Sequence, residues 1–166
     1  MKYFGQKSVS SVISVLLAIA WPVVLIAAIG GSVFFGTISF SDRANSFITA
    51  EMAKDPGITP KEMKEWEDFR NAPVPLKMLV FPYGAAVAVL LLMIIAKSKQ
   101  LFDNFKKEMI FSKANVDLLT NTNKLILAFS IITFNISSIF TCILLFMLAQ
   151  IFKNGAELQE EHDLTV

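Results

Sequence analysis

The sequence has few of the residues from which most catalytic and metal sites are built. Among its 166 residues there is one cysteine, Cys142, and one histidine, His162, and only 17% of the residues are charged. A single cysteine excludes a secreted scaffold held together by disulfides. The net charge of +1 argues against a nucleic-acid binder, which needs a basic face. We therefore expect no metal, no cofactor and no direct contact with nucleic acid.

The patterns of the common catalytic sites are also missing. The chain has no glycine-rich phosphate loop, and its paired acids Glu160 and Glu161 lie in a short polar tail with no pocket around them. Cys142 lies inside an apolar run, where a cysteine behaves as a small hydrophobic residue. The sequence therefore predicts no catalytic residue and a protein that is not an enzyme.

Apolar residues, in contrast, are abundant, at 54% of the chain, and 15 residues are phenylalanine. They gather in three uncharged runs, at residues 9–40, 78–96 and 125–152. Because a spanning helix needs about 20 apolar residues and lipid offers the backbone no hydrogen-bond partners, each run is expected to be a transmembrane helix. The predicted fold is an all-α integral membrane protein. It is a single membrane domain over residues 1–166, with spans at about 9–36, 76–97 and 124–152.

The first run has a second reading, as a cleaved signal peptide. The apolar region of a signal peptide has about 7–15 residues, roughly half the length of this run. We therefore expect the run to be kept as a transmembrane helix.

The third run also allows two readings. Its 28 residues would form a helix of about 42 Å, whereas the hydrocarbon core of a bilayer is about 30 Å thick. One long tilted helix gives three spans. The alternative is four spans, with a hairpin near residues 135–138 and a first arm from about Val116. That arm would carry Asp117, Asn121, Asn123 and Lys124 into or near the lipid, which is costly and favours three spans.

The charges between the runs predict the orientation. The segment 97–124 has six Lys/Arg and three acids, the segment 37–77 has six and seven, and the tail 153–166 has one and four. Lys and Arg collect on the cytoplasmic side of a membrane. The segment 98–123 and the N-terminus are therefore expected in the cytoplasm and the loop 37–75 outside. The acidic tail 153–166 then lies outside with three spans and inside with four.

The extracytoplasmic loop 37–75 is expected to form a small helical hairpin. Thr59-Pro60-Lys61-Glu62 is a capping box with proline at the first helical position, so a helix should run from there to about Asn71. Ser41 can cap an upstream helix that ends before Asp55-Pro56-Gly57. Trp66 is expected to anchor the hairpin at the membrane surface.

The segment 98–123 opens with an amphipathic stretch, which is typical of an interfacial helix or of a cytoplasmic extension of the second span. Its candidate interfacial residues combine lysines that reach lipid headgroups with aromatic side chains: Lys97, Lys99, Phe102, Phe105, Lys106, Lys107 and Phe111. Ser112 is the expected N-cap of the segment that follows.

Small and hydroxyl-bearing residues recur at four-residue spacing within the runs, which lets helix backbones approach closely. The candidates for helix packing are Ala27, Gly31, Gly84, Ala88, Thr133, Ser137 and Thr141. The last three would form one polar stripe on the third span, and in a homo-oligomer this stripe would suit a transporter or channel. No charged residue lies deep in the runs, whereas ion-coupled transporters usually need one.

Two stretches carry a recognisable pattern. Ile110, Phe111, Ser112 and Asn115 match the phrase IF(S/T)xxN, and residues 158–166 read LQEEHDLTV. In both stretches the chain resembles a family of small bacterial membrane proteins, domain of unknown function 2975, over about residues 78–166. The resemblance implies four spans and a gene often found beside a small helix-turn-helix transcription regulator. The long outer loop and the short stretch after Asn115 depart from the family's pattern.

The resemblance implies a non-enzymatic membrane protein that is the regulatory partner or membrane anchor of that regulator. The tail offers acids and a short apolar end for such a contact, with the candidates Glu160, Glu161, Asp163, Leu164, Thr165 and Val166. On the residues alone, the acids suit equally well the solvated end of a long helix, and Gly155 is a candidate end of that helix. The alternatives are a transporter or channel subunit and an envelope-binding stress protein that acts through the outer loop.

Overall fold

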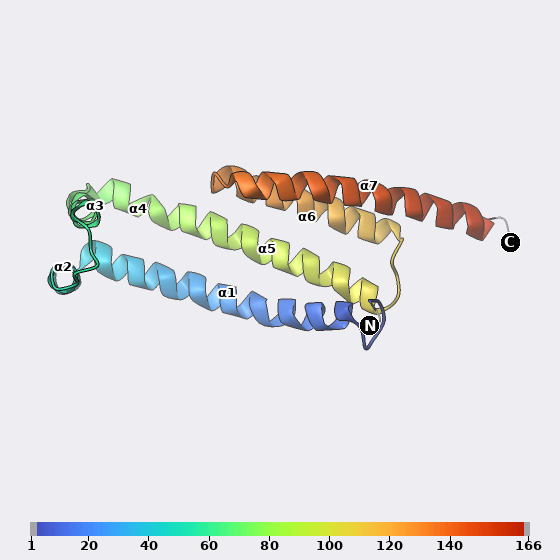
Figure 1. Cartoon of the computed structure of the whole chain (residues 1–166), viewed down its shortest axis with the longest axis horizontal. Coiled ribbons are helices and arrows are strands. Elements are labelled where there is room, and N and C mark those ends of the chain that lie inside the picture. Colours follow the sequence, from blue (N-terminus) through green and yellow to red (C-terminus); the bar gives the residue numbers. More distant parts are fainter. Residues whose placement is uncertain (1–2, 165–166) are drawn as a thin grey trace. The chain divides into compact units, whose positions relative to one another are not determined.

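The computed structural model describes the backbone of residues 3–164 and the side chains of residues 3–161. Over this part of the chain all regular structure is helical (Figure 1). In chain order the helices are α1 (Val9–Phe40), α2 (Asp42–Met52), α3 (Pro60–Asn71), α4 (Val74–Met78), α5 (Val80–Lys106), α6 (Lys113–Ile132) and α7 (Ile136–Leu164).

Three helical stretches are long and apolar enough to cross a membrane: Val9–Phe40, Val74–Lys106 and Ile136–Glu161. Many of their large apolar side chains are exposed, among them Ile26, Val33 and Leu144. A soluble helix would bury such a face against its neighbours, whereas a spanning helix turns it toward lipid. The prediction of an all-helical protein with three apolar helices of spanning length is therefore confirmed.

The third apolar run is not one helix. The chain turns at residues 133–135, between the end of α6 and the start of α7. Phe134 has a left-handed backbone (φ 51°), and the Asn135 side chain caps α7 by accepting from the backbone N–H of Ser138 (3.2 Å). Because an asparagine side chain competes with helical hydrogen bonds, it favours a helix start over a helix interior. The expected single helix over 124–152 is wrong, and the turn lies at the edge of the alternative hairpin site.

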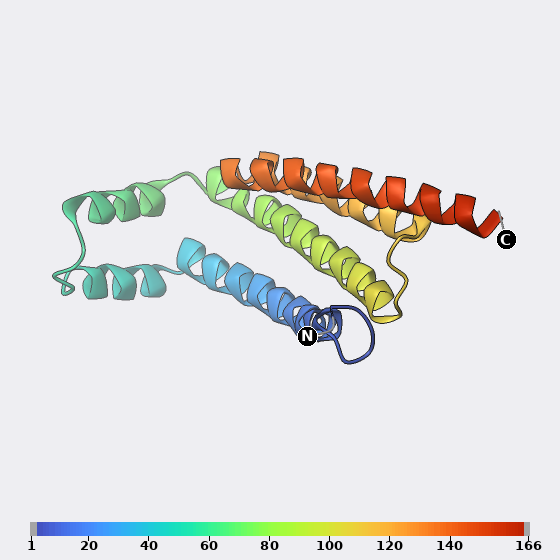
Figure 2. The ribbon, with the colours of Figure 1, turned by 45° about the vertical axis from the view of Figure 1, so that its right-hand side comes forward.

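α6 and α7 lie side by side as an antiparallel pair (Figures 1 and 2). Three small residues of α7 are buried, Cys142, Ala149 and Ala156, and each follows the last by seven positions. Two helical turns separate such residues, so they lie on one face of the helix. Their small side chains allow the close approach of α6. None of the three is among the residues predicted to pack helices together.

The chain divides into two compact units. Unit 1 consists of Met1–Leu25 and Val87–Val166, and unit 2 of Ile26–Ala86. The core of unit 1 is formed where α5, α6 and α7 meet, by Leu101, Phe105, Leu119, Ala149 and Phe152.

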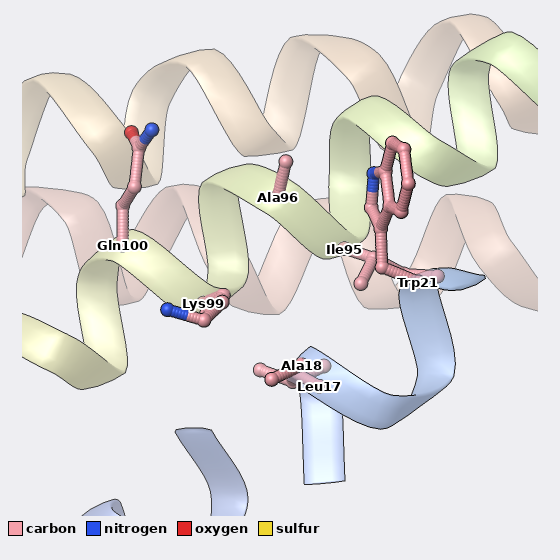
Figure 3. Close-up of a pocket in the computed structure, with 7 residues that line it drawn as sticks. All are labelled: Leu17, Ala18, Trp21, Ile95, Ala96, Lys99 and Gln100. Atoms are coloured by element: carbon pink, nitrogen blue, oxygen red, sulfur yellow. The ribbon is translucent and has the colours of Figure 1, made fainter. Parts of the chain in front are cut away.

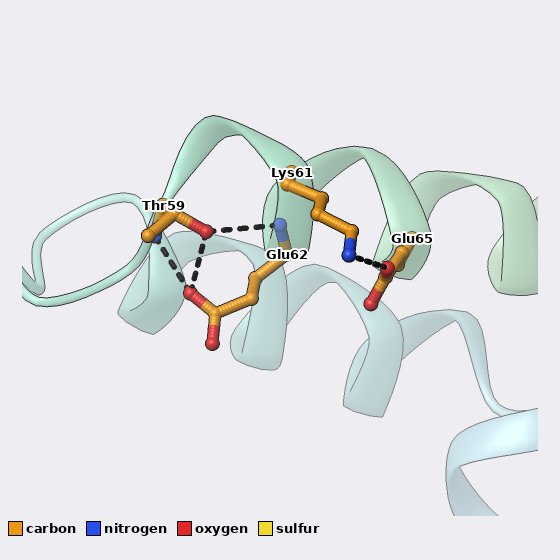
Figure 4. Close-up of polar contacts among 4 residues, drawn as sticks. All are labelled: Thr59, Lys61, Glu62 and Glu65. Carbon is orange, nitrogen blue, oxygen red and sulfur yellow. Dashed lines mark hydrogen bonds and ion pairs between the residues drawn. The ribbon is translucent and has the colours of Figure 1, made fainter.

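In unit 2, both helices expected in the loop 37–75 begin at the predicted residues. The Ser41 hydroxyl accepts from the backbone N–H of Ala44 (3.3 Å) at the start of α2. At the start of α3 the Thr59 hydroxyl accepts from Glu62 N (3.3 Å), while a Glu62 carboxylate oxygen accepts from Thr59 N (2.8 Å), as Figure 4 shows. The capping box is therefore present, with Pro60 at the first helical position.

Aromatic rings hold unit 2 together. Phe35 of α1 packs on Phe69 of α3 and on Phe81 of α5, with ring centroids 5.6 Å apart in both pairs. The indole N–H of Trp66 donates to the Thr49 hydroxyl (2.8 Å), which ties α3 to α2. Trp66 therefore has a partner within its own unit besides any contact with the membrane surface.

Lys77 is buried in unit 2, with 7% of its surface exposed. Its ammonium group donates to the backbone oxygens of Arg70 (2.8 Å) and Ser39 (3.5 Å) and lies over the Phe69 ring (5.5 Å to the centroid). These oxygens belong to the last turns of α3 and α1, where helix carbonyls lack partners and carry partial negative charge. Lys77 lies 38 positions from Ser39, and no local pattern in the sequence predicts their contact.

Candidate functional site

The candidate site is one end of unit 1, which we call the basic end. It comprises residues 3–8, the last turns of α5, the loop 107–112, the start of α6 and residues 149–161 of α7. Most of the predicted site residues of unit 1 lie there, and the contacts below explain how they come together.

Phe105 is the centre of the basic end. It is buried, and its ring lies 5.6 Å from that of Phe4, 5.7 Å from that of Phe102 and 5.7 Å from that of Phe152. The backbone oxygen of Phe105 also accepts from the N–H of Gly5 (3.2 Å). The N-terminal segment, α5 and α7 are therefore packed on one residue.

Asn115 fixes the loop between α5 and α6. It is fully buried, and its amide nitrogen donates to the backbone oxygens of Met109 (2.8 Å) and Ile110 (2.9 Å). Its amide oxygen accepts from the Asn104 side chain (2.6 Å). The Ser112 hydroxyl accepts from Asn115 N (3.3 Å) and caps α6, as predicted. These bonds satisfy loop carbonyls that no helix could pair, so the phrase IF(S/T)xxN has a structural role here.

Phe111, the aromatic residue of the same phrase, packs on α7. Its ring centroid is 5.3 Å from that of Phe152, and a Cβ atom on Gly155 would lie 2.5 Å from Phe111 Cδ1. Gly155 is therefore required for a close approach and does not end the helix, since α7 continues to Leu164. The expectation that Gly155 ends the helix is therefore wrong. The glycine lies inside α7, where its missing side chain leaves room for the Phe111 ring.

A polar link joins α1 to α5. Asp103 accepts from the Ser14 hydroxyl with Oδ1 (2.5 Å) and from the Lys99 ammonium with Oδ2 (2.6 Å). Ser10 and Ser14 are both buried, and they lie on one face of α1. Ser14 and Asp103 are 89 positions apart, and no local pattern in the sequence predicts their contact.

The acidic end of α7 is helical and exposed. Leu158 is 67% exposed, and Glu160 and Glu161 are also exposed. A Glu157 carboxylate oxygen lies 3.9 Å from the Lys153 ammonium nitrogen. Asp163 and Leu164 belong to the helix, but their side chains lie outside the described residues, as do Thr165 and Val166 altogether.

The predicted interfacial residues divide into two groups. Phe105 is in the core, and Phe102 and Phe111 pack on neighbouring rings, so much of the aromatic face is turned toward protein. Lys107 is exposed, and Lys97, Lys99 and Lys106 are half-buried. α5 runs without interruption to Lys106, so the stretch is an extension of the second apolar helix.

Most of the residues predicted to pack helices together are exposed, whereas Ala88 and Thr133 are half-buried. Ala27, Gly31 and Gly84 are exposed, and a Cβ atom on either glycine would meet no other atom within 4 Å. The polar stripe is interrupted because Thr133 ends α6 while Ser137 and Thr141 belong to α7. The hydroxyls of Thr133 and Thr141 each donate to a backbone carbonyl one helical turn back.

Among the described residues, no group of three or more His, Cys, Asp or Glu side chains lies close enough together to hold a metal ion. Comparisons with models of protein families, with curated proteins and with solved structures found no match. The resemblance to the family known as domain of unknown function 2975 therefore stays a prediction from the residues quoted above.

Proposed function

We propose that the chain is a non-enzymatic, multi-pass protein of the bacterial inner membrane that binds a small helix-turn-helix transcription regulator through the cytoplasmic end of α7. The observation that carries this proposal is the packing of Phe111 on Phe152 and Gly155. This packing holds residues 152–155, where the acidic tail begins, against the basic segment 97–124.

That contact supports a cytoplasmic end of α7. The segment 97–124 has six Lys/Arg and three acids, and such segments stay in the cytoplasm. Since residues 152–155 pack against residues 105–111, the acidic end of α7 belongs to the same side. The turn at 133–135 supports this when α6 is a fourth crossing beside α7, because the chain then leaves and returns to one side between Asn115 and Phe152, as in the four-span alternative.

The chemistry of the tail suits a regulator of transcription. A DNA-binding domain carries a basic face, and acids at 157, 160, 161 and 163 offer it opposite charge. The exposed Leu158 adds an apolar contact on the same helix. An acidic helix that occupies the basic face keeps the regulator both at the membrane and away from DNA.

The test uses the full chain in nanodiscs and a small helix-turn-helix regulator, the kind of partner that the resemblance implies is encoded beside the gene. We expect the regulator to bind the wild-type protein and the Glu160→Lys/Glu161→Lys variant to bind at least about tenfold more weakly, a difference of about 1.4 kcal/mol. The matched control is Glu67→Lys/Asp68→Lys, which reverses two exposed acids of α3 in unit 2 and should leave binding unchanged. Equal binding by both charge-reversed variants, or no binding by the wild type, contradicts the proposal.

A further inference from the structure

A groove lies between α1 and α5 within unit 1, and we call it the α1–α5 groove. It has a volume of about 320 Å³. Figure 3 shows the residues that line it: Leu17, Ala18, Trp21, Ile95, Ala96, Lys99 and Gln100. This volume is at the lower end of the range of about 300–1,000 Å³ found for small-molecule sites.

The groove crosses the boundary between apolar and charged sequence. Ala96 is the last residue of the uncharged run of α5, and Lys97 is the first charged residue after it. Leu17, Ala18 and Ile95 give the groove an apolar wall, while Lys99 and Gln100 give it a polar end. A bilayer has the same division between apolar and polar surroundings where its acyl chains meet its headgroups.

Lys99 brings a positioned cation to the groove. Asp103 accepts one hydrogen bond from its ammonium (2.6 Å) and is itself held by the Ser14 hydroxyl. An ammonium has three N–H donors, and 39% of the Lys99 side chain is exposed, so it can donate to a second group. Asp103 therefore orients the lysine while leaving donors for a ligand.

The surroundings favour an anion. Residues 97–107 contain four lysines against one aspartate, a net charge of +3. Trp21, which is 39% exposed, brings an indole N–H for which no described residue is an acceptor. Tryptophan at the level of the headgroups commonly donates to their oxygens. A second copy that brought the same face to the contact would be repelled by this charge.

We propose that the α1–α5 groove binds an anionic glycerophospholipid. Its phosphate accepts from Lys99 and from the indole of Trp21, and part of an acyl chain lies along Leu17, Ala18 and Ile95. This site is independent of the regulator contact on α7, because the two sites use different helices of unit 1.

The test uses Trp21 as the reporter. The chain has two tryptophans, so Trp66→Phe leaves Trp21 as the only one. The full chain is reconstituted in phosphatidylcholine vesicles in which a minor fraction of the lipid has brominated chains, either phosphatidylglycerol or phosphatidylcholine. Bromine quenches tryptophan fluorescence on contact. We expect brominated phosphatidylglycerol to be enriched around Trp21 about fivefold over brominated phosphatidylcholine, the effect of one lysine close to an anionic headgroup.

Two variants and one control separate a site from diffuse surface charge. Lys99→Gln should abolish the preference, and so should Ala18→Phe, which fills the groove without changing the charge. Lys107→Gln removes an exposed lysine that does not line the groove and should keep the preference. Equal quenching by the two brominated lipids overturns the proposal, as does a loss in Lys107→Gln equal to that in Lys99→Gln. Trp21 shielded from both lipids, increasingly so at higher protein density, would instead assign the groove to a second copy.

Discussion

The Phe111 ring lies against Gly155, so close that a Cβ atom on the glycine would be 2.5 Å from Phe111 Cδ1. This contact joins the phrase at residues 110–115 to the root of the C-terminal phrase at residues 158–166. The phrase at residues 110–115 therefore packs on α7 three residues before the C-terminal phrase begins.

Gly155→Ala tests this joint. Alanine is normally the better helix former by about 0.5–1 kcal/mol, but here its methyl group would collide with a ring. We expect a net loss of about 1–3 kcal/mol, the usual cost of overpacking, measured by thermal unfolding in detergent. Gly31→Ala is the control, because its Cβ would meet no atom within 4 Å, and it should stabilise the protein slightly.

A double-mutant cycle decides whether Phe111 causes the loss. If Phe111 causes the loss, Gly155→Ala should cost little stability in a Phe111→Ala background, so the two changes are strongly non-additive. Additive losses would mean that Phe111 is not the neighbour of Gly155.

Asn115 and Asn123 are both fully buried residues of α6, but they differ in their hydrogen-bond partners. Asn115 makes side-chain hydrogen bonds to Met109, Ile110 and Asn104, whereas neither amide atom of Asn123 has a partner among the described residues. A buried polar group without a partner costs about 1–3 kcal/mol. Asn123→Leu should therefore stabilise the protein and Asn115→Leu should destabilise it, by amounts in that range. Thermal unfolding of the pair checks this, and the same sign for both variants would contradict it.

Lys77→Met should loosen unit 2. The change keeps most of the apolar stem but removes the ammonium group that serves the last carbonyls of α1 and α3. We expect a loss of about 1–3 kcal/mol, since the Arg70 and Ser39 oxygens are left without this donor. Susceptibility of the segment 41–72 to added protease measures the loss. Lys64→Met, at an exposed position of α3, should leave the susceptibility as it is in the wild type.

The α3 cap should weaken in acid. Hydrogen bonds from the Thr59 backbone, and then from its hydroxyl, lower the pKa of Glu62 below its ordinary value of 4.5. Because the folded-state pKa is depressed, the stabilisation is present above the ordinary pKa and is lost as the pH falls through the lowered pKa. Protease susceptibility of the segment 55–65 should rise over that acidic range. In Thr59→Ala, which costs the cap about 1 kcal/mol, the segment should be susceptible already at neutral pH and change less with acid.

The elements that local signals determine could be predicted from the sequence. The starts of α2 and α3 follow from Ser41 and from the Thr59 capping box, because a cap is decided by residues within one turn. The apolar helices follow from length and composition alone.

Contacts between distant residues could not be predicted in this way. Lys77 meets Ser39 across 38 positions and Ser14 meets Asp103 across 89, and no local pattern marks either pair. The turn at 133–135 is disfavoured in the sequence because four polar residues of the first arm are expected in or near lipid. In the structure Asn123 is buried inside unit 1, whereas Asp117, Asn121 and Lys124 are exposed on the first half of α6.

The last prediction concerns the side of the membrane on which the chain ends. A cysteine added after Val166, in a protein with Cys142→Ala, should not react with an impermeant thiol reagent in intact cells and should react after lysis. The reason is the packing of residues 152–155 on the basic segment, which positive charge retains in the cytoplasm. Cys142 is buried in the α7 face toward α6, so alanine is a mild replacement. The matched probe is Lys64→Cys in the same background, at an exposed position of α3 in the loop that is expected outside, and it should react in intact cells. If the terminal cysteine reacts as readily as the Lys64→Cys probe, α7 ends outside. A cytoplasmic regulator could then not reach the acidic helix, and the binding lost in Glu160→Lys/Glu161→Lys would need another cause.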